Sequence, residues 1–61
     1  MRYLIKLEND LFGWNGHISV NSDKKEISKY AKRFGYASAA SAREDAQCMG
    51  YEDVKIIEFR V

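Results

Sequence analysis

Residues able to carry out hydrolysis are scarce in this chain of 61 residues. It has one cysteine, Cys48, and one histidine, His17, together with serines and carboxylates. A hydrolase needs a nucleophile, a base and a group that orients the base. Cys48 lies near the end of a predicted helix and His17 on a predicted hairpin, and no motif links them. We therefore expect Cys48 to be a buried or half-buried small apolar residue, His17 to lie on the surface, and the chain not to be an enzyme.

Metal and cofactor motifs are also missing from the sequence. One histidine and one cysteine cannot fill the four positions of a structural zinc site. Gly13 and Gly16 lack the lysine and the following helix that a phosphate-binding loop needs. Two acidic pairs, at 44–45 and 52–53, flank the ends of a predicted helix, whose rise of about 1.5 Å per residue keeps them apart. The sequence therefore predicts neither a metal nor a cofactor.

Size and composition limit the class of protein. The chain is 46% hydrophobic and 31% charged with a net charge of +1, which argues against disorder and against a global field that attracts nucleic acid. A single cysteine excludes an intrachain disulfide, so stability depends on packing or on a partner subunit. No apolar run approaches the roughly 18 residues of a membrane span, and the start of the chain lacks the apolar region of a signal peptide. We expect one soluble domain over residues 1–61, located in the cytoplasm, with no membrane partner.

Three segments have the pattern of β-strands. Residues 2–8 and 16–20 alternate apolar and polar side chains. Turn residues at 9–10 and 13–16 separate them, so we expect a β-hairpin with a long tip. Residues 53–61 form the last predicted strand and are apolar on both faces. That pattern indicates an interior strand, or one whose second face is covered by a partner.

The clearest helix is predicted over residues 38–49. Ser38 or Ser41 can cap its start, and Gly50 suits the left-handed conformation that ends a helix. Residues 22–35 are ambiguous, because their apolar side chains have helical spacing but can also be read as a turn followed by a strand. One main helix on a three- or four-stranded sheet is an α+β architecture, in the order strand, strand, ambiguous segment, helix, strand.

Several short stretches from residue 23 onward combine small-residue packing with helix-capping residues. They are Ala-Lys-Arg-Phe at 31–34, Ser38 or Ser41 before Ala42-Arg43, then Ala46, Gly50, and Val-Lys-Ile-Ile at 54–57. With these stretches the chain resembles short uncharacterised proteins of phages and bacterial mobile elements, of ββαβ type. In such proteins Ala-Lys-Arg-Phe leads from a turn or short strand into the helix, which implies a strand at 30–34. Some proteins of this size inhibit host defence, including anti-CRISPR proteins, so the resemblance implies a host protein as partner and the host cytoplasm as location.

The predicted hairpin tip, residues 11–16, carries two large aromatic residues in a glycine-rich turn. Exposed Trp and Phe are favoured anchors at protein interfaces. The alternative is that Trp14 folds back over the sheet as a lid. We predict a non-catalytic protein-binding module that inhibits a host protein, with Phe12 and Trp14 as anchors and Tyr36 and Tyr51 as further contact residues.

Two other functions remain open. Lys29, Lys32 and Arg33 are interleaved with aromatic residues, a pattern typical of surfaces that hold phosphates and stack bases. The plain alternative is that the aromatic residues are core and the lysines are a solvated surface. A third possibility is a homodimer in which residues 55–61 pair or pack with the same segment of a second copy.

Overall fold

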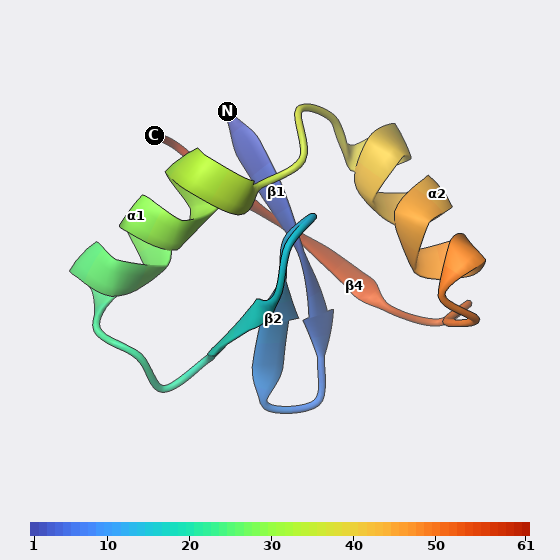
Figure 1. The fold of residues 1–61 in the computed structure, drawn as a ribbon, viewed down its shortest axis with the longest axis horizontal. Coiled ribbons are helices and arrows are strands. Elements are labelled where there is room, and N and C mark those ends of the chain that lie inside the picture. Colours follow the sequence, from blue (N-terminus) through green and yellow to red (C-terminus); the bar gives the residue numbers. More distant parts are fainter.

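The computed structural model describes residues 1–61 as a four-stranded antiparallel sheet with one helix on each face (Figure 1). In chain order the elements are β1 Arg2–Leu7, β2 Asp10–Phe12, β3 His17–Ser19, α1 Lys24–Phe34, α2 Ala39–Cys48 and β4 Lys55–Phe59. The strand order across the sheet is β3-β2-β1-β4. The predicted α+β class is confirmed. Of the three or four strands expected, the sheet has four, but one of them is β2, which was not predicted, and the structure adds a second helix.

The central strand β1 sends successive side chains to opposite faces of the sheet, as any strand does. Leu4 is 0% exposed and packs in a cluster with α1, whereas Ile5 is 1% exposed and packs in a cluster with α2. Because a helix covers each face, the strand is apolar in both directions at its middle. This explains why Leu4 departs from the alternation of the sequence.

Helix α1 lies within residues 22–35, the segment whose secondary structure the sequence left ambiguous. Ile27 and Ala31 are buried against Leu4 and Leu11 of the sheet, at the four-residue spacing of one helix face. The expectation of a strand at 30–34 is therefore wrong. A strand would turn Ala31 and Arg33 to the same face, so burying the alanine would bury the arginine with it.

Helix α2 agrees closely with its prediction. Ala42 and Ala46 are both 0% exposed, and their small side chains let the helix lie close to the sheet. Of the two possible caps, Ser38 is the one used, since its hydroxyl accepts a hydrogen bond from the backbone N–H of Ser41 at 3.1 Å. Gly50 follows the helix with φ of 90°, the left-handed conformation expected of it.

The start of the chain differs from the predicted hairpin. Residues 2–8 do not pair with residues 16–20, because β2 lies between them and pairs with both β1 and β3. The first turn consists of residues 8–9 rather than 9–10, and Glu8 adopts a positive φ of 56° there. The expected long tip therefore contains a strand, which takes Phe12 out of the loop.

Strand β4 is an edge strand, so the expectation of an interior position is wrong. Its apolar residues nevertheless serve both faces of the sheet. Ile57 and Phe59 pack against the α1 cluster, whereas Val54, just before the strand, and Ile56 pack against the α2 cluster. A strand with a helix on each side is apolar on both faces wherever it lies in the sheet.

Candidate protein-binding site

The loop between β2 and β3, residues 13–16, lies against the last turn of α1 and is held by two tyrosines. The backbone N–H of Gly13 donates to the Tyr30 hydroxyl at 2.9 Å, and that hydroxyl donates to the carbonyl oxygen of Gly16 at 2.7 Å. The Tyr36 hydroxyl lies 3.1 Å from the carbonyl oxygen of Gly13. Side chains on both sides of the loop thus fix its backbone.

Gly13 is required by this packing and not by its backbone conformation. A Cβ built on Gly13 would clash with the carbonyl oxygen of Phe34 at the end of α1. Its φ lies outside the left-handed region, so steric exclusion is the reason for glycine here. Gly16 is the opposite case, since its φ is +82° and a Cβ there would meet open space. One glycine lets the loop touch the helix, and the other lets it turn.

Trp14 caps the C-terminal end of α1. Its backbone N–H donates to the carbonyl oxygen of Phe34 at 2.8 Å, and its indole Nε1–H donates to that of Arg33 at 3.2 Å. These carbonyls have no partner within the helix. The indole also meets the Phe34 ring edge-on, with centroids 5.3 Å apart. Trp14 is nevertheless 61% exposed, so it covers the end of α1 and is not a lid over the sheet.

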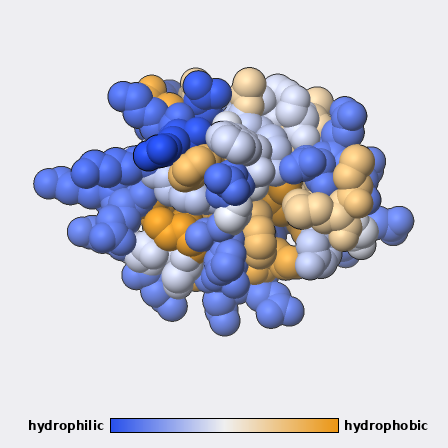
Figure 2. Space-filling model, in the orientation of Figure 1, coloured by the Kyte–Doolittle hydropathy of each residue, from blue (hydrophilic) through white to orange (hydrophobic).

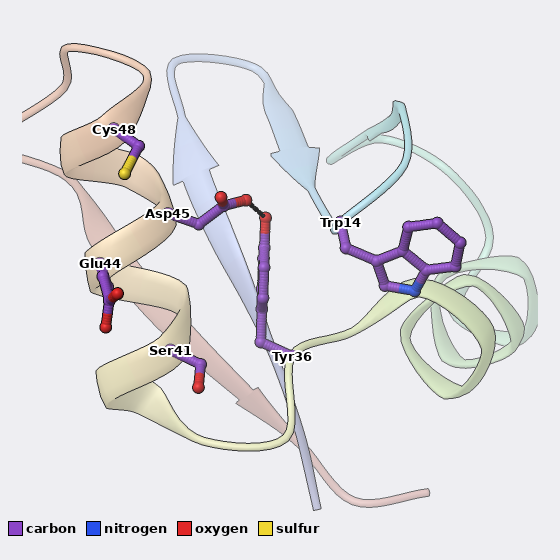
Figure 3. Close-up of a pocket in the computed structure, with 6 residues that line it drawn as sticks. All are labelled: Trp14, Tyr36, Ser41, Glu44, Asp45 and Cys48. Atoms are coloured by element: carbon purple, nitrogen blue, oxygen red, sulfur yellow. Dashed lines mark hydrogen bonds between the residues drawn. The ribbon is translucent and has the colours of Figure 1, made fainter.

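A groove of about 350 Å³ separates Trp14 from α2. It is lined by Trp14, Tyr36, Ser41, Glu44, Asp45 and Cys48. Figure 3 shows Tyr36 standing between the helix and Trp14, with its hydroxyl toward Asp45, while the indole turns toward the end of α1. The α2 side chains form one wall, Tyr36 the floor and Trp14 the other wall.

The polar contact in the groove joins Tyr36 to Asp45. Tyr36 is only 8% exposed, and its hydroxyl donates to the Asp45 carboxylate. Burial is the main cause that raises the pKa of Tyr36 far above its ordinary value of 10.0, and the hydrogen bond to Asp45 adds to it. The phenol is therefore neutral at physiological pH and serves as a donor. Asp45 and the exposed Glu44 make the α2 wall acidic.

The arrangement in the groove suits binding and does not assemble a reactive set. Cys48 is exposed at the end of α2, so the expectation that it is buried or half-buried is wrong. It falls on the side of the helix away from Ala42 and Ala46, which face the sheet. His17 is exposed on β3, as predicted, with its ring 5.2 Å from that of Phe12. No group of three His, Cys, Asp or Glu side chains could hold a metal ion.

The four predicted contact residues lie in different places. Trp14 and Tyr36 share the groove, but Tyr36 offers little surface because it is buried. Phe12 is half-buried at the end of β2 and packs against the α2-side cluster, so it is not an exposed tip residue. Tyr51 is 41% exposed, beyond the end of α2. Of the predicted pair of anchors, only Trp14 presents a large exposed ring.

The basic residues of the alternative function lie on the other helix. Lys29, Lys32 and Arg33 are all exposed on α1. Lys25, Lys29 and Lys32 follow the i, i+4, i+7 spacing of a single helix face, which we call the lysine face. The Arg33 guanidinium lies 5.3 Å from the centroid of the Phe34 ring, next to Trp14. The structure therefore separates the basic surface on α1 from the acidic wall on α2.

Sequence reasoning missed the hydroxyl of Tyr30, which joins α1 to the loop. The burial of the Tyr30 ring raises the pKa of its hydroxyl, and the hydrogen bond from Gly13 partly offsets that shift. The available signal was a tyrosine, and not a phenylalanine, at a core-facing position of a helix. A buried tyrosine hydroxyl usually has a hydrogen-bond partner.

A second groove, of about 430 Å³, lies on the other face of the sheet, beside the first turn of α1. Leu11, Val20 and Ile57 give it an apolar lining, and Lys6 and Lys24 stand at its edge. Figure 2 shows apolar surface between α1 and the sheet, bordered by hydrophilic atoms. Sequence reasoning did not identify this groove, because it depends on how far α1 stands from the sheet.

The length and polarity of the two helices rule out either of them as a membrane span. No protein-family model matches the chain, and no curated protein or solved structure is significantly similar to it.

Proposed function

We propose that this chain is a non-catalytic protein-binding module whose anchor is Trp14. The observation that carries the proposal is an indole that is 61% exposed yet already fixed, by its hydrogen bond to Arg33 and its contact with Phe34. Ordering a free side chain at an interface costs about 0.5–1.5 kcal/mol. For Trp14 most of that cost is met when the protein folds. Tryptophans of this kind are frequent hot spots.

The acidic wall beside Trp14 indicates the chemistry of the partner surface. Glu44 is exposed and Asp45 faces the groove, so a lysine or arginine of the partner would find carboxylates between the indole and α2. Hydrogen bonds between such charged groups are stronger than neutral ones. The partner we propose thus has an apolar pocket for the indole and a basic side chain next to it.

The biological setting we propose is that of a phage or mobile-element factor that blocks a host protein, in the manner of an anti-CRISPR protein. This part of the proposal rests on the sequence resemblance alone. It directs the choice of material for the test, because the partner would then be a protein of a bacterial lysate.

The test compares tagged wild-type chain with three variants on a nuclease-treated bacterial lysate, with bound proteins quantified by mass spectrometry. We expect Trp14→Ala to lower retention of the partner by roughly thirtyfold, as for a hot spot of about 2 kcal/mol. Glu44→Lys should lower it by roughly tenfold, because it reverses the charge of the acidic wall. Lys25→Ala lies on the lysine face of α1 and should leave retention within about twofold.

Folding controls keep this test decisive, since Trp14 also caps α1. Thermal unfolding followed by circular dichroism reports whether each variant is folded at the temperature of the assay. Glu44 is exposed, so Glu44→Lys tests the site without touching the core. A partner that folded Trp14→Ala and Glu44→Lys both retain at the wild-type level would show the proposal to be wrong.

Nucleic-acid binding is a second candidate, favoured by the position of Trp14 beside the basic helix. Its indole N–H donates a hydrogen bond to the backbone carbonyl of Arg33. A ring able to stack on a base therefore lies at the end of the lysine face. This function predicts binding to single-stranded DNA or RNA that falls steeply with salt, and equal losses for Lys25→Ala and Lys32→Ala. Lys25→Ala, which should leave protein binding unchanged, therefore separates the two functions.

A further inference from the structure

The outer edge of β4 is regular and open. The strand pairs with β1 alone, in an unbroken register from Arg2 opposite Phe59 to Lys6 opposite Lys55. It contains neither proline nor a residue with positive φ. Protected edges often carry a proline, a bulge, an inward-pointing charge or exposed charged side chains, and of these β4 has only the exposed Lys55 and Glu58. The backbone N–H and C=O groups on this side are therefore available to another strand.

The side chains of this edge are more apolar than an edge facing water requires. Ile56, Ile57 and Phe59 are only half-buried, and Val61 beyond them is 51% exposed. The core that they border is small, because the only large side chains that are fully buried are Leu4 and Ile5. Small domains without a disulfide or a metal commonly gain burial by self-association.

We propose that β4 pairs with β4 of a second copy of this chain, antiparallel about a two-fold axis at Ile57. Two four-stranded sheets would then join into one continuous sheet. Ile57 is the middle residue of the strand Lys55–Phe59, so this register uses all of it. Lys55 then lies opposite the partner's Phe59, and Ile56 opposite the partner's Glu58.

This register is favoured by charge as well as by length. An axis at Glu58 or at Lys55 would place two like charges directly opposite each other, which destabilises a sheet. An axis at Ile57 opposes no like charges. The pairing does not involve the groove beside Trp14, so it stands or falls independently of the proposed function. It would give the assembly two Trp14 anchors, and thus bivalent binding.

The first test is sedimentation equilibrium of the full chain, from about 10 µM to about 1 mM, a range in which interfaces of modest size assemble. We expect the mass to rise from the 7.1 kDa of one chain toward twice that value. A mass that stays at one chain throughout would overturn the proposal.

A matched pair of variants at one position of β4 tests the register. Ile56→Glu and Ile56→Lys both place a charge at the same half-buried site, but only glutamate meets the like charge of the partner's Glu58. We expect the dimer dissociation constant of Ile56→Glu to exceed that of Ile56→Lys by roughly tenfold. Equal constants for the two variants would contradict this register.

Disulfide trapping gives a second measure of the register, in a Cys48→Ser background that removes the only native thiol. Ile57→Cys should form a covalent dimer on mild oxidation, because the two Cα atoms across the axis would lie within the roughly 7 Å that a disulfide can bridge. Ile56→Cys and Glu58→Cys should each form no covalent dimer alone, and should crosslink to each other when mixed. A crosslink pattern without this complementarity would overturn the register.

Discussion

The two helices cover opposite faces of one sheet by different means. Helix α2 approaches through Ala42 and Ala46, has a side-chain cap at Ser38 and ends in a left-handed glycine. Helix α1 packs through Ile27 and Ala31, has no side-chain cap at its start, and leaves the groove of about 430 Å³ beside its first turn. Small side chains hold α2 close to the sheet, whereas α1 packs through Ile27 and Ala31 and is held further by contacts at its C-terminal end.

The held end of α1 is where the candidate site lies. Two hydrogen bonds from Trp14 and one contact from Gly13 join the β2–β3 loop to the last turn of the helix. The loop thus stabilises α1 where its carbonyls lack partners, and α1 in turn fixes the exposed indole. The four predictions below test this contrast between a tightly packed helix and a helix clamped by a loop.

The largest effect should come from Gly13→Ala, which disrupts the contact between the β2–β3 loop and the last turn of α1. Its Cβ would clash with the Phe34 carbonyl oxygen, and neither backbone can yield easily. We expect a loss of about 3 kcal/mol in the free energy of unfolding, at the upper end for overpacking, measured by urea denaturation. Gly16→Ala is the control, with open space but a positive φ, and should cost only about 1 kcal/mol. Equal costs would mean that the loop does not press on α1.

Larger side chains should destabilise the protein at the packed face of α2 but not beside the start of α1. Ala46→Leu inserts a larger side chain into the closed contact between α2 and the sheet and should cost about 2 kcal/mol. Ser28→Leu places the same side chain over the open groove beside α1 and should change stability by less than about 0.5 kcal/mol. Urea denaturation of both variants measures the difference. A destabilising Ser28→Leu would show that the start of α1 is as tightly packed as α2.

The Tyr36 hydroxyl should make stability depend on alkaline pH. Its pKa is raised in the folded protein above the ordinary value of 10.0, so the neutral phenol stabilises the fold fully below about pH 10. That contribution is lost as pH rises above 10 toward the folded pKa, because the unfolded chain ionises first. Tyr36→Phe should cost about 1–2 kcal/mol at pH 7 and lose less stability than wild type between pH 9 and about 11.

Guanidinium denaturation across this pH range provides the measurement for Tyr36. Tyr3 and Tyr30 also have raised pKa values, the first chiefly through its hydrogen bond to Glu58 and the second through burial. The variant should therefore keep part of the pH dependence. An unchanged slope in Tyr36→Phe would contradict the assignment to Tyr36.

The smallest effect concerns the starts of the helices. Ser38→Ala removes the hydroxyl that caps α2 and should lower stability by about 1 kcal/mol. Asp23 stands at the same position before α1 but makes no side-chain capping hydrogen bond. Asp23→Ala should therefore change stability by only about 0.3 kcal/mol. Thermal unfolding of the two variants checks the difference. Equal losses would indicate that Asp23 caps α1 in solution.

Sequence patterns predicted the structure correctly where the interactions behind them join residues that are close in the chain. Caps and left-handed glycines act within a few residues, so the two candidate caps, Ser38 and Ser41, included the one that starts α2, and Gly50 marked its end correctly. The helical spacing at 27–34 was also a correct signal, and the resemblance that favoured a strand there was misleading. Strand β2 was missed because three residues are too few to show a period against the turn residues around them.

The sequence by itself determined the class of fold, the presence of the second helix and its end at Gly50, and the choice of Trp14, a large aromatic residue in a glycine-rich segment, as the candidate anchor. Only the tertiary structure decided that Trp14 caps α1, that Phe12 and Tyr36 turn inward, and that β4 is an edge. These outcomes depend on contacts between residues distant in the chain, such as Gly13 with Phe34. Local patterns carry no information on such contacts, because they arise only when the sheet and both helices are packed together.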